Sequence, residues 1–199
     1  MSRLSPAFVL GYHGCDAEVA QRAIGGGSLK PSENDYDWLG SGVYFWEADP
    51  DRAWQWAYEQ NSRGKIEKPA ILGAVIDLRN CLNLTTQEGV SLLRKAYESY
   101  KAFREIEGKP LHVNSDLARI PSSDKLMRRL DNAVIERLHG LVKDNNLEPF
   151  DTVRGMFREG EAIYPNAGFW EKTHVQIAVR NHDCIIGYFK PKLKLLLIK

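Results

Sequence analysis

Three short segments of the sequence combine residue types that could hold a flat, polar ligand and act on it. Tyr12-His13-Gly14 follows an apolar run, and Gly40-Ser41-Gly42-Val43-Tyr44-Phe45 places a serine between two glycines ahead of aromatic residues. Glycines let a backbone approach a ligand closely, and a tyrosine after such a turn presents a ring and a hydroxyl. His174-Val175-Gln176 adds polar groups late in the chain. Each segment alone is typical of an ordinary core strand, but together they predict a nucleotide-sized site.

Composition excludes several functional classes. The chain has 199 residues, 43% of them hydrophobic, which predicts a single globular domain over residues 1–199. A formal net charge of +1 predicts no whole-molecule attraction to nucleic acid or an acidic membrane. Cys15, Cys81 and Cys184 show no metal-ligand spacing and no disulfide framework, so we expect a metal-independent protein of the reducing cytoplasm. The sequence has no membrane-span or signal-peptide pattern, so we expect no membrane partner.

Strands and short helices are predicted at both ends of the chain. Residues 7–12 form a buried strand that ends at His13, and Asp16 caps a short helix. Asp49-Pro50-Asp51 has the oxygen-bearing cap and early proline of a helix start. Asn181-His182-Asp183 predicts a tight hairpin between two late strands. The other predicted strands are residues 43–46, 71–78, 153–157, 175–179, 184–189 and 193–198.

Residues 85–146 have a different, helical character. Thr85 and Glu88 have capping-box spacing at the start of a long amphipathic helix that reaches about Ile106. A second long helix is predicted to begin at Ser122 or Ser123, with an apolar stripe at four-residue spacing. We expect these two helices to form an α-helical hairpin inserted between parts of a β-rich domain, and we expect their stripes to serve packing.

In chain order, the segments resemble the ADP-ribosyltransferase superfamily, specifically the His-Tyr-Glu branch of poly(ADP-ribose) polymerases and diphtheria-toxin-like enzymes. The first motif of that branch is similar to Tyr12-His13-Gly14-Cys15, the second to residues 40–45 followed by Ala53, and the third to the strand Val175-Gln176-Ile177-Ala178-Val179. The resemblance covers both ends of the chain and leaves out the helical residues 85–146. It implies an α+β fold with a split, twisted β-sheet that holds NAD+ in a cleft.

The resemblance also implies a role for each motif residue. His13 would hydrogen-bond the adenosine-side ribose, and the backbone of Gly14 would hold the nicotinamide carboxamide. Tyr44 would stack on the nicotinamide ring, with Trp54 or Trp56 against its second face. The implied NAD-binding residues are Tyr12, His13, Gly14, Gly42, Tyr44 and Trp54.

One position departs from the family pattern. Breaking the nicotinamide glycosidic bond develops positive charge on the ribose, which a glutamate usually stabilises. This chain has Gln176 there, which can hydrogen-bond the ribose but carries no charge. Three alternatives stay open: a loop carboxylate (Glu159, Glu161 or Glu171) supplies the charge, a single ADP-ribose is transferred without it, or NAD is bound without turnover. The predicted catalytic residues are His13, Tyr44, Gln176 and Glu161.

The resemblance implies an NAD-dependent mono-ADP-ribosyltransferase that releases nicotinamide and modifies a macromolecular acceptor, protein or nucleic acid. Arg158 and Lys172 could contact the pyrophosphate, and His174 shares a strand face with Gln176. The small size fits a toxin, as in a toxin–antitoxin pair, or a defence effector, and the helical insertion could receive an inhibitory protein partner. The alternatives are a non-catalytic NAD or ADP-ribose-binding module and an RNA 2′-phosphotransferase-like enzyme, which would need several arginines in the cleft.

Overall fold

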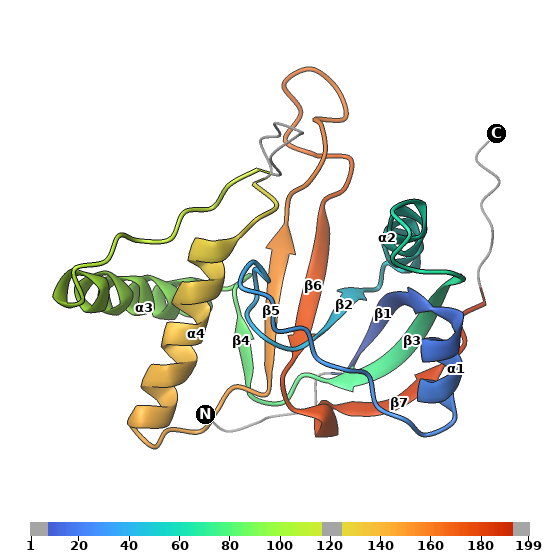
Figure 1. Cartoon of the computed structure of the whole chain (residues 1–199), viewed down its shortest axis with the longest axis horizontal. Helices are drawn as coiled ribbons and strands as arrows, with labels where there is room; N and C mark the ends of the chain where they lie inside the picture. The colour runs from blue at the N-terminus through green and yellow to red at the C-terminus, as the bar shows by residue number, and fades with distance from the viewer. Residues whose placement is uncertain (1–7, 117–124, 193–199) are drawn as a thin grey trace.

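The computed structural model describes residues 8–116 and 125–192, and its centre is a twisted β-sheet with helices on both faces (Figure 1). The described strands are β1 (Phe8–Asp16), β2 (Val43–Glu47), β3 (Pro69–Asp77), β4 (Cys81–Asn83), β5 (Thr152–Phe157), β6 (His174–Val179) and β7 (Ile185–Phe189). They form one seven-stranded sheet in the order β4-β5-β6-β2-β1-β3-β7. β4 pairs with β5 in parallel, and the other neighbouring strands pair antiparallel. The fold is therefore α+β with a mixed sheet.

The described α-helices begin largely where local capping signals place them. They are α1 (Ala17–Ile24), α2 (Pro50–Ser62), α3 (Gln87–Ile106) and α4 (Arg129–Asp144). The side chain of Asp16 accepts a hydrogen bond from the Glu18 amide, and that of Asp49 accepts one from the Arg52 amide, so both predicted N-caps are confirmed. The cap of α3 is Thr86 rather than Thr85. Within the described residues, no helix has the length and apolarity to cross a membrane.

Alternation along the central strand β2 assigns the helices to two faces of the sheet. Val43 and Phe45 join a buried cluster with Ala20 and Ala23, so α1 covers that face. Tyr44 points to the opposite face, where it packs against the apolar cluster of α3 and α4. Helix α2 packs on this second face as well, over β1. The second face is therefore covered by α2 at one end and by α3 and α4 at the other (Figure 1).

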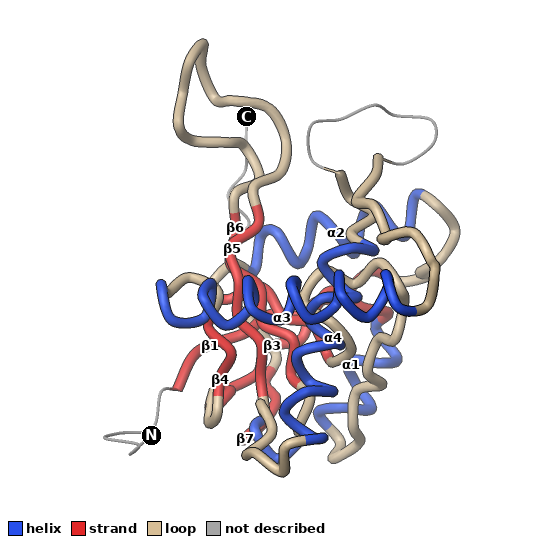
Figure 2. The backbone as a smooth tube through the Cα atoms, turned by 90° about the vertical axis from the view of Figure 1, so that its left-hand side faces the viewer, coloured by secondary structure: helices blue, strands red, loops and turns tan. Residues whose placement is uncertain are grey.

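The helices α3 and α4 contact each other but do not lie side by side. In two perpendicular views α3 runs across α4, so their arrangement differs from the expected hairpin (Figures 1 and 2). Helix α4 begins at Arg129, which corrects the predicted start at Ser122 or Ser123. Those two serines lie outside the described residues, as do residues 193–198, where a strand was predicted.

Two predictions about the strands are wrong: where β1 ends and how β6 connects to β7. In both cases pairing with distant strands sets the outcome. β1 does not end at His13, as predicted, but continues to Asp16, since its last residues pair with β3 as far as Pro69. The predicted hairpin at residues 181–183 is absent. β6 pairs with β2 and β5, whereas β7 pairs with β3 at the far edge of the sheet. Residues 182–184 form a short 3-10 turn that carries the chain between these positions.

Candidate functional site

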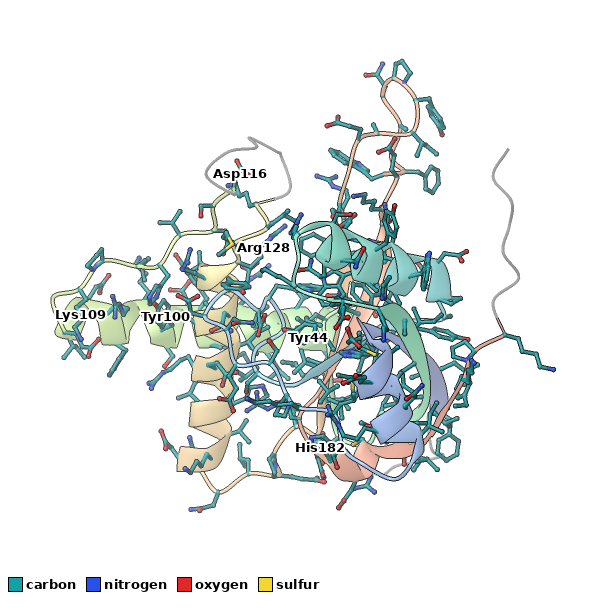
Figure 3. The ribbon with its side chains drawn as sticks, turned by 45° about the vertical axis from the view of Figure 1, so that its right-hand side comes forward. Tyr44, Tyr100, Lys109, Asp116, Arg128 and His182 are labelled. Atoms are coloured by element: carbon teal, nitrogen blue, oxygen red, sulfur yellow. The ribbon has the colours of Figure 1, made fainter. Side chains whose placement is uncertain are left out.

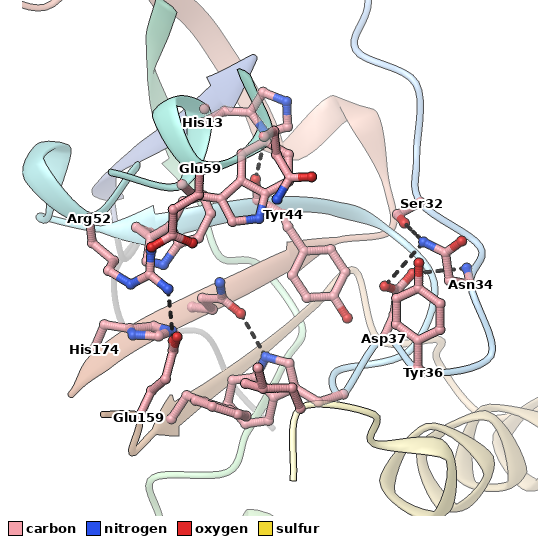
Figure 4. A pocket seen from close by; sticks show the side chains of 18 of the residues that line it. His13, Ser32, Asn34, Tyr36, Asp37, Tyr44, Arg52, Glu59, Glu159 and His174 are labelled. Atoms are coloured by element: carbon pink, nitrogen blue, oxygen red, sulfur yellow. Dashed lines mark hydrogen bonds and ion pairs between the residues drawn. The ribbon is translucent and has the colours of Figure 1, made fainter. Parts of the chain in front are cut away.

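A cavity of about 570 Å³ lies on the second face of the sheet, next to α2 (Figure 4). Its lining includes His13 from β1, Tyr44 from β2 and Gln176 from β6, which are far apart in the sequence. The loop of residues 30–42 and the segment just before α4 complete the walls. In Figure 3, Tyr44 lies near the middle of the molecule, whereas Lys109 lies beyond the outer end of α3. The structure therefore brings three of the predicted site residues to one cavity.

His13 reaches the cavity where the pairing of β1 with β2 stops. The β1–β2 ladder consists of only two residue pairs, Gly11 with Glu47 and Tyr12 with Trp46. Beyond it, His13 Nδ1 donates a hydrogen bond to the Tyr44 carbonyl oxygen at 2.8 Å. Burial lowers the pKa of His13, although the bond to Tyr44 opposes the shift, so the ring is neutral at physiological pH. With Nδ1 protonated, Nε2 is left as a hydrogen-bond acceptor.

Gly14 allows α2 to lie directly over β1. A side chain at this position would collide with the Ala53 carbonyl oxygen and would stand 3.0 Å from the ring of Trp56. Trp56 lines the cavity, so this close approach sets the position of the α2 wall. The glycine is required here by packing, independently of any contact that its backbone makes with a ligand.

Tyr44 fixes the glycine turn with its hydroxyl and lines the cavity with the rest of its side chain. The hydroxyl donates to the Gly40 carbonyl oxygen at 2.8 Å and accepts from the Leu39 amide at 3.0 Å. Burial and the nearby Asp37 carboxylate raise the pKa of Tyr44, so the phenol stays protonated. Gly40 has φ of +76°, a left-handed conformation that favours glycine. The two hydrogen bonds of the hydroxyl to the turn therefore fix the orientation of the Tyr44 ring.

Side chains of helix α4 form hydrogen bonds with the same turn. Glu136 Oε1 accepts from the Ser41 amide at 2.7 Å and from Arg180 Nη1 at 3.1 Å. Arg180 Nη1 also donates to Ser41 Oγ at 2.9 Å, and Asn132 Nδ2 donates to the Asp37 carbonyl oxygen at 2.9 Å. Burial alone would raise the pKa of Glu136, but the Ser41 amide and the Arg180 guanidinium outweigh it, so the carboxylate is ionised. The cavity wall thus depends on the helical segment that the family resemblance leaves out.

Gln176 is buried and its amide is oriented by an indole. Its Oε1 accepts from Trp38 Nε1 at 2.6 Å, and only 9% of the residue is exposed. The amide nitrogen is therefore the group of this side chain that is left to donate to a ligand. Across the β2–β6 ladder Gln176 pairs with Trp46, and His174, two residues earlier, lines the cavity from the same strand face.

One of the three loop glutamates enters the cavity. Glu159 belongs to the lining, and its Oε2 accepts from Arg52 Nη2 at 2.7 Å. Lys172 Nζ lies 3.8 Å from Glu159 Oε1. Glu161, the predicted catalytic carboxylate, and Glu171 are exposed on the projecting loop and do not line the cavity. Of the three loop glutamates, the one that shares the cavity with the predicted site residues is therefore Glu159.

The other predicted binding residues divide between the cavity and its surroundings. Gly42 is part of the lining, but Tyr12 packs edge-on against Phe189, with ring centroids 6.1 Å apart, and does not line the cavity. Trp54 is also outside the lining, and Trp56 takes its place. Arg158 stacks over Trp170 at 4.2 Å and lies outside the lining too.

Sequence reasoning missed a polar face of α2 that lines the cavity. The lining residues of this helix and its cap recur at helical spacing, and they are Arg52, Trp56, Glu59, Gln60 and Arg63. Lys30 and Lys65 add positive charge from the neighbouring loops. The i, i+4, i+7, i+8, i+11 spacing can be seen in the sequence and indicates one face of a helix. Only the packing of α2 over β1 shows that this face lines a cavity.

Among residues 8–116 and 125–192, no group of three or more histidine, cysteine, aspartate or glutamate side chains could hold a metal ion. The cavity offers aromatic rings, amide and indole donors, the neutral histidines His13 and His174, and the carboxylate of Glu159 paired with Arg52. Such a set can bind and orient a nucleotide by stacking and hydrogen bonding.

Comparison with known proteins finds a relative that matches most of the chain. No protein-family model and no solved structure matches the chain significantly. The chain is 33% identical over 193 residues to the uncharacterized protein MJ0359 of Methanocaldococcus jannaschii, and the match covers 87% of this chain and 83% of that protein. A match to 87% of this chain must span the helical residues 85–146. The chain therefore belongs to the same family as this archaeal protein.

Proposed function

We propose that the protein is an NAD-dependent mono-ADP-ribosyltransferase that transfers ADP-ribose to a macromolecular acceptor and releases nicotinamide. The observation that carries the proposal is that His13, Tyr44 and Gln176, one residue from each of three separated motifs, line one cavity. A chance resemblance in short motifs gives no reason for this convergence. The proposal also includes an ADP-ribosyltransferase-like sheet, in which the early end of the β1–β2 ladder marks the split that receives NAD+.

Each motif residue has a free group suited to its proposed contact. His13 Nε2 can accept from a ribose hydroxyl, because Nδ1 is committed to the Tyr44 carbonyl oxygen. The Tyr44 ring can stack on nicotinamide, because its hydroxyl is committed to the turn. Trp56, held over β1 by the space at Gly14, offers a second aromatic surface. Since the partners of these groups are fixed by the fold, little ordering would remain for the ligand to supply.

The developing positive charge on the ribose is the demanding part of the reaction. Gln176 can orient the ribose but cannot stabilise that charge as a carboxylate would. Glu159 is the loop glutamate that reaches the cavity, so we assign the electrostatic role to it. Its contact with Arg52 at 2.7 Å keeps the carboxylate in place. The positive charge of Arg52 also weakens the electrostatic effect of this carboxylate on the ribose.

Labelled NAD+ tests the proposal directly. The purified protein is incubated with labelled NAD+ and cell extract, and nicotinamide release and transfer of label into protein or nucleic acid are measured. We expect both, and we expect His13→Ala and Tyr44→Ala each to reduce release by at least about a hundredfold while circular dichroism shows an intact fold. Tyr58→Ala is the matched control, because Tyr58 also lies near the cavity wall on α2 but is 60% exposed and does not line the cavity.

The results separate three readings. Release with transfer of label supports the transferase and identifies the class of acceptor. Saturable NAD binding without release would leave a non-catalytic binding module. Full activity in either the His13→Ala or the Tyr44→Ala variant would refute the roles assigned to these residues.

A further inference from the structure

One end of the cavity contains buried hydrogen-bond donors that have nothing to bind. Arg52 is 8% exposed, and its Nη2 donates to Glu159, whereas its Nε and Nη1 have no partner within residues 8–116 and 125–192. Trp46 is 5% exposed, and its Nε1 likewise lacks a partner there. The two side chains are neighbours, since the guanidinium lies 5.6 Å from the centre of the Trp46 ring. Both residues line the cavity.

Unmade hydrogen bonds of this kind are expensive. A buried neutral donor without a partner costs about 1–3 kcal/mol, and a charged one costs more. Nearly all buried polar groups in folded proteins are therefore paired, and exceptions in a cavity point to a ligand. His174 completes this end of the cavity and stacks on Phe157, with ring centroids 5.6 Å apart (Figure 4). Its Nδ1 is 2.6 Å from the Lys172 carbonyl oxygen and so is committed to the backbone.

We propose that this end of the cavity, bounded by Trp46, Arg52 and His174 and here called the donor pocket, binds a phosphoryl group. Two donors of one guanidinium and one indole N–H need several acceptor oxygens close together, which a tetrahedral oxyanion supplies and a single carbonyl does not. Arginine is the side chain best suited to such a group. Naming the bound molecule rests on the proposed function: the phosphoryl group belongs either to NAD+ or to the acceptor.

Glu159 can give way to such a ligand. The unpartnered nitrogen atoms have almost no exposed surface, so an oxyanion reaches them only after a neighbouring side chain moves, and we infer that this side chain is Glu159, which already contacts Arg52. Lys172 provides an alternative partner, since its Nζ is already 3.8 Å from Glu159 Oε1. An exchange of Glu159 from Arg52 to Lys172 would leave both carboxylate and guanidinium paired. The glutamate therefore competes with the phosphoryl group for Arg52.

Because Glu159 and phosphate compete for Arg52, substitutions of the two residues should change phosphate affinity in opposite directions. Binding of inorganic phosphate to the full chain is measured by isothermal titration calorimetry in a phosphate-free buffer. We expect saturable binding that Arg52→Gln weakens at least about tenfold and Trp46→Phe, which removes the indole N–H and keeps an aromatic ring, weakens about threefold to tenfold. Glu159→Gln should instead tighten binding about threefold or more, because it removes the competing charge.

The matched control is Arg94→Gln, which removes an exposed arginine of α3 that does not line the cavity. It should leave the phosphate affinity within about twofold of the unmodified protein. If Arg52→Gln fails to fold, Trp46→Phe and Glu159→Gln still decide the question by their opposite effects. Phosphate binding that is absent, unchanged in both of these variants, or weakened equally by Arg94→Gln would overturn the donor pocket.

A second titration in the presence of saturating NAD+ identifies the source of the phosphoryl group. Loss of phosphate binding assigns the donor pocket to a phosphate of the dinucleotide, whereas unchanged binding assigns it to the acceptor. Failure of the proposed function is distinguishable. A protein that binds phosphate through Arg52 but shows no NAD binding or turnover keeps the donor pocket and loses the transferase assignment.

Discussion

Tyr44 and Gln176 each use one part of the side chain for the fold and leave another part for a ligand. The Tyr44 hydroxyl ties the turn at Gly40, and Oε1 of Gln176 is held by the Trp38 indole. The ring of the first and the amide nitrogen of the second remain available at the cavity. Polar groups that are already fixed in place need no reorganisation when a transition state forms, which is the main source of electrostatic catalysis.

The substitution Gln176→Glu tests which residue supplies the negative charge that would stabilise the ribose in the proposed reaction. A glutamate at this position could still accept from Trp38 Nε1, so the substitution adds a negative charge with little change in packing. If position 176 is the one that faces the ribose, nicotinamide release should rise by about tenfold or more, which corresponds to about 1.4 kcal/mol of transition-state stabilisation. The rate is measured by nicotinamide release at saturating NAD+. An unchanged rate, together with a large loss in Glu159→Gln, would assign the charge to Glu159.

The site residues that sequence reasoning placed in the cavity are those that belong to local motifs. His13, Tyr44 and Gln176 could be picked because each follows a turn or lies on a recognisable strand. Among the three loop glutamates that the sequence left open, Glu159 lines the cavity and Glu161 does not, because a long-range partner decides which glutamate of a loop turns inward. That partner is Arg52 on α2, about a hundred residues away in the chain, and no local pattern encodes the contact.

At the scale of elements, the packing of α2 on β1 decides whether a cavity exists. Gly14 is the contact point, where a side chain would collide with the backbone of Ala53. Caps at Asp16 and Asp49 could be predicted because a cap depends on neighbouring residues alone. The start of α4 and the position of β7 could not, since β7 pairs with β3 across the sheet rather than with the strand that precedes it.

A pair of glycine substitutions tests the contact between α2 and β1. Gly14→Ala puts a methyl group into the backbone of α2, so we expect a loss of about 2–4 kcal/mol in the free energy of unfolding and loss of NAD binding. Gly140→Ala is the control: this position lies inside α4 with open space around it, and the change should stabilise by about 0.5–1 kcal/mol. Denaturant unfolding measures both. A Gly14→Ala protein of normal stability that binds NAD normally would contradict the close approach.

The whole molecule should lose stability in mild acid because several histidines are buried. Burial lowers the pKa of His13 and His174, and burial together with Arg180 lowers the pKa of His139 to about 4. In the unfolded chain each histidine takes up a proton near pH 6.5, so the unfolded state binds more protons below that pH. The free energy of unfolding should therefore fall from about pH 6.5 to pH 4, with His139 contributing up to about 3 kcal/mol of the loss.

Denaturant unfolding across this pH range checks the prediction. His139→Gln cannot take up a proton, so its stability should fall less steeply between about pH 6.5 and pH 4 than that of the unmodified protein. Identical slopes for the two proteins would show that His139 is not the group responsible.

The hydrogen bonds between α4 and the glycine turn couple the position of this helix to the shape of the cavity. Asn132 and Glu136 bond the Asp37 carbonyl oxygen and the Ser41 amide, so the seating of this helix and the shape of the cavity mouth share the same bonds. Two events that share bonds are thermodynamically reciprocal. If the cavity binds a nucleotide as proposed, a nucleotide that stabilises these bonds would make the helix harder to displace, and a protein that displaced the helix would weaken nucleotide affinity by the same factor. The helical segment would then influence affinity without contacting the ligand.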